Sequence, residues 1–94
     1  MTVRDTGSRF VLREAGAVAR LRYRLDGDQL ILEHTEVPDE LEGRGIGSSL
    51  VRAAVDRARA DGLTLVAECR FASAWLRRHA SDLADLEVEH NPIN

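Results

Sequence analysis

The sequence contains no lysine, so all 13 of its Lys and Arg residues are arginines. This absence excludes the phosphate-binding loop of nucleoside triphosphatases, which ends in Gly-Lys-Ser or Gly-Lys-Thr. Cysteine is nearly absent too, because Cys69 stands alone and has no partner for an internal disulfide. No apolar run approaches the roughly 20 residues that cross a bilayer, and the N-terminus lacks the apolar stretch of a signal peptide. We therefore expect a cytoplasmic protein that does not associate with membranes.

Aromatic residues make up only 4% of the chain, which predicts a mostly aliphatic core. The 16 acidic residues give a net charge of -3, which argues against a protein that binds nucleic acid by neutralising phosphates. With 94 residues, we expect one compact domain over 1–94, as a monomer or a homodimer. The tail from about residue 81 to 94 permits either a short helix or a strand.

Three segments in the first third alternate between apolar and polar residues, as strands do. They cover Arg9–Arg13, Ala17–Leu25 and Leu30–Val37, separated by turns at Ala15-Gly16 and Asp26-Gly27-Asp28. In the second segment Leu25 is expected on the buried face. In the third, His34 is expected to face the same way as Leu30 and Leu32.

A helical period then runs from Ile46 to Asp61, with Gly62 as a left-handed cap. A short apolar strand over 63–67 follows, and the strand-helix-strand order predicts that it lies parallel to the third strand. A second helix is expected over 71–79, with Phe71, Trp75 and Leu76 facing inward. The predicted class is α+β, a mixed and mostly antiparallel sheet with a β-α-β crossover and helices packed on it.

Glycines cluster where the third strand gives way to the long helix, at Gly43, Gly45 and Gly47. Backbone N–H groups at such a junction come close to a ligand, and the helix N-terminus adds a positive dipole end. The same glycines also serve tight turn geometry alone, so the residues by themselves leave both interpretations open. Their spacing does not fit the dinucleotide-binding fingerprint.

This turn resembles the acyl-CoA motif of the GNAT (Gcn5-related N-acetyltransferase) superfamily, whose pattern is Gln or Arg, two residues, Gly, one residue, then Gly or Ala. Gly45 and Gly47 match this pattern, whereas Glu42 departs from its first position. The chain is more closely similar to the compact one-domain branch, through His34-Thr35, Val37-Pro38 and a cysteine followed by phenylalanine and a tryptophan helix. The resemblance implies an acyl-CoA N-acyltransferase-like fold and use of acetyl-CoA. It also implies that the CoA site comprises Val37, Gly43, Arg44, Gly45, Ile46, Gly47, Ser48 and Ala72.

The same resemblance places Cys69 where larger relatives carry a CoA-contacting asparagine. Cys69 is then a candidate nucleophile or acid, although a lone cysteine at a strand end also serves as a small buried hydrophobe. His34 is the candidate base, because its ordinary pKa lies near neutrality, or else a hydrogen-bonded core residue. Glu36 and Glu68 are weaker alternatives. The spacing of Cys69 and the histidines predicts no metal site.

The predicted activity is transfer of an acetyl group from acetyl-CoA to a primary amine, with a protein or peptide as one kind of acceptor. Two rival hypotheses remain open. One is a CoA-binding or sensing module without catalysis, and the other is an interaction domain without any ligand.

Overall fold

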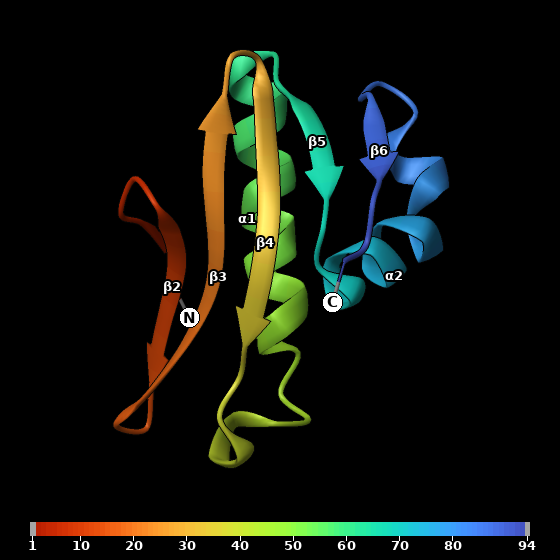
Figure 1. Ribbon diagram of the computed structural model, residues 1–94. Coiled ribbons are helices and arrows are strands. Elements are labelled where there is room, and N and C mark those ends of the chain that lie inside the picture. The colour runs from red at the N-terminus through yellow and green to blue at the C-terminus, as the bar shows by residue number, and fades with distance from the viewer. Residues whose placement is uncertain (1, 94) are drawn as a thin grey trace.

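The computed structural model describes residues 2–93, so Met1 and Asn94 of the expected domain lie outside the described residues. Six strands and two helices make up the fold (Figure 1). The strands are β1 (Arg4–Asp5), β2 (Arg9–Glu14), β3 (Ala17–Asp26), β4 (Gln29–Glu36), β5 (Thr64–Ala67) and β6 (Val88–His90). The helices are α1 (Ile46–Asp61) and α2 (Arg70–Arg78), and short 3-10 turns cover Asp39–Leu41 and Ala80–Leu83.

The six strands form one mixed sheet in the order of the sequence. Neighbouring strands from β1 to β4 are antiparallel, whereas β5 runs parallel to both β4 and β6. The predicted parallel pairing across the crossover is therefore confirmed, and so is the α+β class. The two residues of β1 were not predicted, because so short a strand has no periodicity of its own and is defined by its pairing with β2.

Both helices pack on the same face of the sheet, and the opposite face carries no described helix (Figure 1). The predicted apolar stripe of α1 is buried against inward side chains of β2 to β5 in one hydrophobic cluster. Trp75 and Leu76 of α2 join this cluster, as expected. Alternate residues such as Ile31 and Val66 point to the other face, which we call the open face.

A β-bulge interrupts the alternation of β4. Arg22 of β3 is opposite His34, but the next residue, Tyr23, is opposite Leu32, so Glu33 is the extra residue on β4. Beyond the bulge the side chains exchange faces: Thr35 joins the face of its buried partner Leu21, and His34 turns to the open face. The bulge therefore decides which side chains of β4 reach each side of the sheet.

Two predictions about side-chain direction are wrong, and the predicted burial of Leu25 is wrong as well. His34 does not share the face of Leu30 and Leu32, because of the bulge. Leu25 does share the face of its buried partner Leu30, but it is 47% exposed there, near the end of the β3–β4 hairpin. Phe71 is 41% exposed, because it lies in the first turn of α2 and points to a pocket rather than into the core.

The tail combines the two structures that its sequence permits, a 3-10 turn at Ala80–Leu83 and then β6. None of the helices within residues 2–93 is long and apolar enough to cross a membrane.

Candidate functional site

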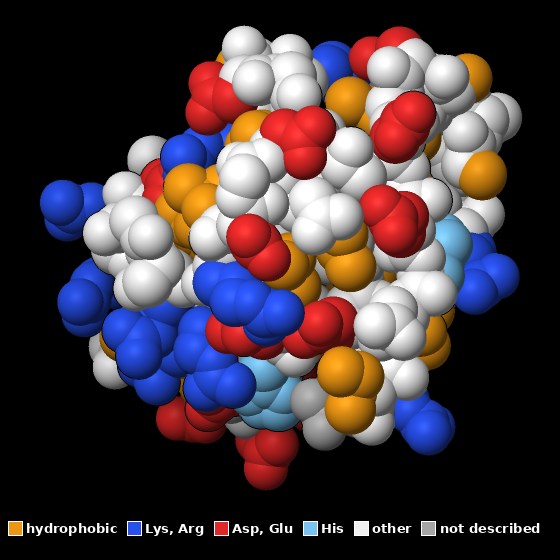
Figure 2. All heavy atoms as spheres, turned by 45° about the horizontal axis from the view of Figure 1, so that its top comes forward, with side chains coloured by type: hydrophobic (Ala, Val, Ile, Leu, Met, Phe, Trp, Pro, Cys, Tyr) orange, Lys and Arg blue, Asp and Glu red, His pale blue; other side chains and the backbone are white. Residues whose placement is uncertain are grey.

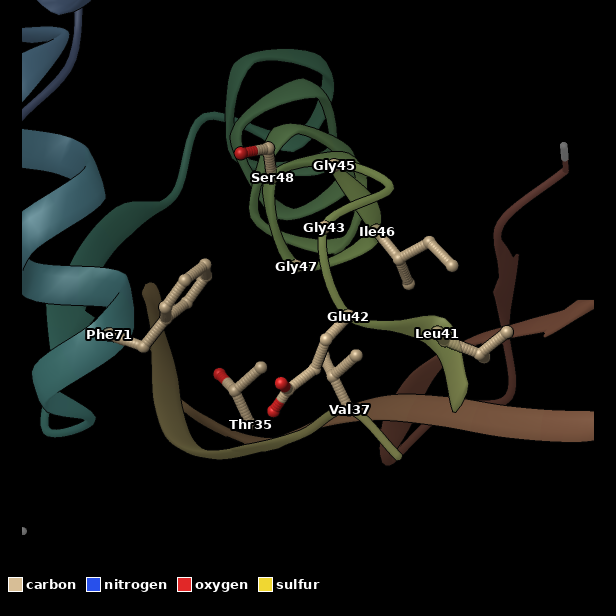
Figure 3. A pocket seen from close by; sticks show the side chains of 10 residues that line it. All are labelled: Thr35, Val37, Leu41, Glu42, Gly43, Gly45, Ile46, Gly47, Ser48 and Phe71. Atoms are coloured by element: carbon tan, nitrogen blue, oxygen red, sulfur yellow. The ribbon is translucent and has the colours of Figure 1, made fainter. Parts of the chain in front are cut away.

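A pocket of about 370 Å³ lies where the end of β4, the glycine turn and α2 meet (Figure 3). Thr35 approaches it from β4, Val37 from the position directly after that strand, and Phe71 from α2 (Figure 3). Its remaining lining comes from the turn and the start of α1, namely Leu41, Glu42, Gly43, Gly45, Ile46, Gly47 and Ser48. Six of the eight residues predicted for CoA thus line one cavity.

The backbone N–H groups of the glycine turn are available to hydrogen-bond a ligand. Gly43 and Gly45 have φ of 77° and 73°, a conformation that other residues adopt only with strain. Gly45 caps α1, and the first hydrogen bond of the helix runs from the Ser49 N–H to the Gly45 carbonyl. Within residues 2–93 the N–H groups from Gly43 to Ser48 find no protein acceptor. Several donors at a helix N-terminus therefore remain available to an anion.

Strands β4 and β5 separate directly beside this pocket. Their last pair is Leu32 with Ala67, yet β4 continues to Glu36. The N–H groups of Glu68 and Cys69 both donate to the Leu32 carbonyl, at 3.0 and 3.1 Å, as β5 turns away into α2. Beyond this point β4 has no strand partner on its β5 side among the described residues. An extended ligand can pair with such an unoccupied edge.

Cys69 lies at this separation and is connected to the pocket through one side chain. Its Sγ atom lies 3.2 Å from Oγ1 of Thr35, and Thr35 lines the pocket. Cys69 itself is only 5% exposed and does not line the cavity. Thr35 was missed as a site residue, because alternation alone places it on the open face and only the bulge turns it inward.

His34 lies on the other side of the sheet from the pocket. Its side chain is 45% exposed, and its Nε2 atom lies 4.0 Å from the Glu36 carboxylate. Because consecutive residues of β4 point to opposite faces here, His34 and Thr35 flank the strand from its two sides. The structure therefore does not bring His34 and Cys69 together on one face.

Phe71 covers part of the glycine turn. An added Cβ at Gly47 would lie 2.6 Å from the far end of the Phe71 ring, so glycine is what lets the ring approach the helix. The sequence did hold a signal that Phe71 belongs to the site, because it follows Cys69 by only two residues. Helical periodicity instead predicted that its ring lies in the core.

Two predicted cofactor residues lie outside the pocket lining. The Arg44 guanidinium is turned toward Glu14, 3.3 Å away, which leaves only its backbone for a ligand in this arrangement. Ala72 is fully buried on the inner side of α2. Glu42, which departs from the motif, does line the pocket, and its carboxylate points toward Thr35 and Val37 (Figure 3).

Comparisons with known proteins identify the family. The family model described as GCN5-related N-acetyl-transferase matches residues 9–86. Among solved structures, the chain is similar to the solution NMR structure of a GCN5-like candidate N-acetyltransferase from Staphylococcus aureus, with 32% sequence identity and a TM-score of 0.73. That match covers 94% of this chain and 88% of the other. No curated protein matches the chain.

The family match thus includes β2 to β5, the glycine turn, both helices and Cys69. The chain belongs to the GCN5-related N-acetyltransferases.

Proposed function

We propose that the chain binds acetyl-CoA in the pocket beside the glycine turn and catalyses acetyl transfer to a primary amine. The observation that carries the proposal is the run of unpaired N–H groups from Gly43 to Ser48, which borders the pocket next to the free edge of β4. A diphosphate needs several converging donors, and a pantetheine amide chain needs a strand edge. Family membership supports the same ligand.

The residues present fit this ligand, with one exception. The turn amides and Ser48 would hold the diphosphate, and Val37 and Thr35 would border the pantetheine arm. The Glu42 carboxylate repels a diphosphate, so it must turn away to solvent, and its exposed position allows this. Bound acetyl-CoA supplies an activated thioester, from which transfer forms an amide and frees the CoA thiol.

The candidate groups lie on opposite faces of the sheet, His34 on the open face and Cys69 on the side of the helices. In the proposed mechanism His34 takes a proton from the acceptor amine on the open face, where Glu36 stabilises the resulting imidazolium. Cys69 acts from the helix side, where the thiol either accepts the acetyl group or protonates the departing thiolate. Thr35 holds the Cys69 sulfur in place through their 3.2 Å contact.

Two measurements test the proposal. Calorimetry with CoA and acetyl-CoA is expected to register one site per chain, and absence of heat would overturn the acetyltransferase assignment. Intact-mass measurement after incubation with acetyl-CoA distinguishes the two roles of Cys69. A covalent acetyl adds about 42 Da and is absent from Cys69→Ala.

The matched control is Cys69→Ser, which keeps the size and the contact with Thr35 but lowers nucleophilicity. If the thiol acts as an acid, the wild type forms no acetyl adduct either, and turnover falls in both Cys69→Ala and Cys69→Ser. Unchanged turnover in both variants would remove Cys69 from the mechanism. Binding without turnover on any amine would favour the sensing module instead.

A further inference from the structure

The open face carries a row of arginines beside the proposed reaction centre. In the β2–β3 register Arg9 is opposite Arg22, Val11 is opposite Arg20, and Arg13 is opposite Val18. Opposed residues share a face, so all of these side chains lie on the open face. Figure 2 shows basic side chains gathered over this part of the molecule.

The arginines of the open face differ in whether a carboxylate forms an ion pair with them. Arg22 and Arg24 are neutralised by Glu33, and Arg24 also by Glu68. In contrast, Arg9, Arg13 and Arg20 have no ion pair with any residue from 2 to 93.

Glu36 is opposite Arg20, but its carboxylate approaches His34 instead. Like charges on neighbouring strands repel, so three unpaired arginines cost stability unless a partner supplies negative charge. This local excess of positive charge contrasts with the net charge of -3 of the whole chain.

The unpaired arginines surround a shallow hollow of about 400 Å³. Its half-buried valines, Val11 and Val18, provide an apolar floor, and Arg9, Arg13 and Arg20 provide the rim, together with Thr6. An apolar floor with a basic rim is complementary to an extended segment that alternates an aliphatic side chain with carboxylates.

The hollow lies at a defined distance from the reaction centre. His34 of β4, Arg22 of β3 and Arg9 of β2 form one row across the sheet. Strands are spaced about 4.8 Å apart, so β2 lies roughly 10 Å from β4, which an extended chain spans in about three residues. In a bound peptide whose amine reaches His34, the residues two to four positions from that amine therefore lie over the arginines.

We propose that this face docks the acceptor as an acidic peptide segment, with Asp or Glu two to four residues from the reacting amine. The proposal rests on the acetyltransferase function proposed above and names the acceptor class. A nucleic acid fits less well, because a continuous phosphate backbone would also pass Glu33, Glu36 and Glu68, which would repel it, whereas the peptide brings its amine to that part of the face and its carboxylates to the arginines.

Fluorescence anisotropy tests the docking independently of turnover. Two labelled lysine peptides of equal length are compared, one with Asp at the flanking positions and one with Asn. We expect the acidic peptide to bind the whole chain on the order of tenfold more tightly, and added salt to remove the difference. Arg9→Gln/Arg20→Gln is expected to abolish the preference. The control Arg77→Gln/Arg78→Gln, which removes two exposed arginines of α2, is expected to keep it.

Equal binding of the two peptides by the wild type would overturn the proposal, even where calorimetry shows that CoA binds. A single-stranded oligonucleotide of equal charge that displaces the acidic peptide at the same concentration would also overturn it. Failure of CoA to bind would leave the peptide preference measurable, so the two proposals fail by different measurements.

Discussion

Glu42 is the residue of the pocket whose charge opposes the proposed ligand. Its carboxylate lines the cavity and points toward Thr35 and Val37 (Figure 3). We expect Glu42→Gln to tighten CoA binding about three- to fivefold. Two unit charges some 5 Å apart in water interact by about 0.8 kcal/mol, and the repulsion with the diphosphate is lost. Calorimetry at low salt measures the change.

The control for this prediction is Glu40→Gln. It removes the same charge from an exposed position of the same loop, outside the pocket lining. An equal gain in both variants would mean that net charge, rather than the place of Glu42, limits affinity.

His34 and Thr35 illustrate what a single sequence can and cannot predict at this scale. Their chemistry is readable, because a histidine and a hydroxyl beside a predicted ligand turn are candidates for proton transfer and positioning. Their directions are not, because a one-residue bulge reverses both and leaves no mark in the alternation of β4. The glycines were easier to assign, because positive φ at Gly43 and Gly45 is a local requirement.

The same distinction holds for the elements. Helix α1 begins and ends as predicted, because Gly45 and Gly62 adopt left-handed conformations at its two caps. The tail was left open because β6 depends on pairing with β5, a contact remote in the sequence. Local signals thus predict the bounds of elements, and long-range pairing decides the remainder.

The pairing of β6 with β5 can be tested through His90. Nδ1 of His90 lies 2.8 Å from Oγ of Ser73, which fastens β6 to α2. Burial lowers the pKa of His90, and the positive charge of Arg77 lowers it further. A lowered pKa in the folded state means that the unfolded state binds the proton more tightly. The stability contributed by neutral His90 is therefore present above its unfolded pKa and lost as the pH falls through the folded value.

Hydrogen exchange measures the effect at individual amides. We expect the N–H groups of Asn91 and Ile93, which donate to Ala67 and Glu68, to lose protection between roughly pH 7.5 and 5, beyond the intrinsic change. His90→Gln is expected to remove this pH dependence, and His79→Gln to retain it. Constant protection of the wild type across this range would contradict the assignment to His90.

At the scale of the whole molecule, the sheet separates two tasks. The face under α1 and α2 holds the core and the proposed CoA pocket, and the open face presents His34 and the arginines. The two faces meet where β4 and β5 separate. Cys69 follows β5 at this point, and His34 lies on β4 beyond its last pair with β5. One substrate can thus be bound from each side.

A chain of this size should be strongly stabilised by its ligand. CoA at 100 times its Kd adds about 2.7 kcal/mol, which for a domain of under 100 residues corresponds to a Tm increase of roughly 10–20 °C. Gly47→Ala should separate this gain from the stability of the free protein. Alanine is favoured over glycine in a helix by up to about 1 kcal/mol, and the far end of the Phe71 ring can move to admit the methyl group.

We therefore expect Gly47→Ala to keep or raise the Tm of the free protein while losing most of the increase that CoA produces. Both Gly47 and Phe71 line the pocket, so the methyl group and the displaced ring together reduce the space for the ligand. The matched control is Ala60→Gly, the reverse exchange at an exposed position near the other end of α1. It should lower the Tm of the free protein, because glycine is the poorer helix former, and keep the full increase with CoA. A full increase in Gly47→Ala would place the ligand elsewhere, whereas a lower Tm of that variant without ligand would show that the ring cannot yield.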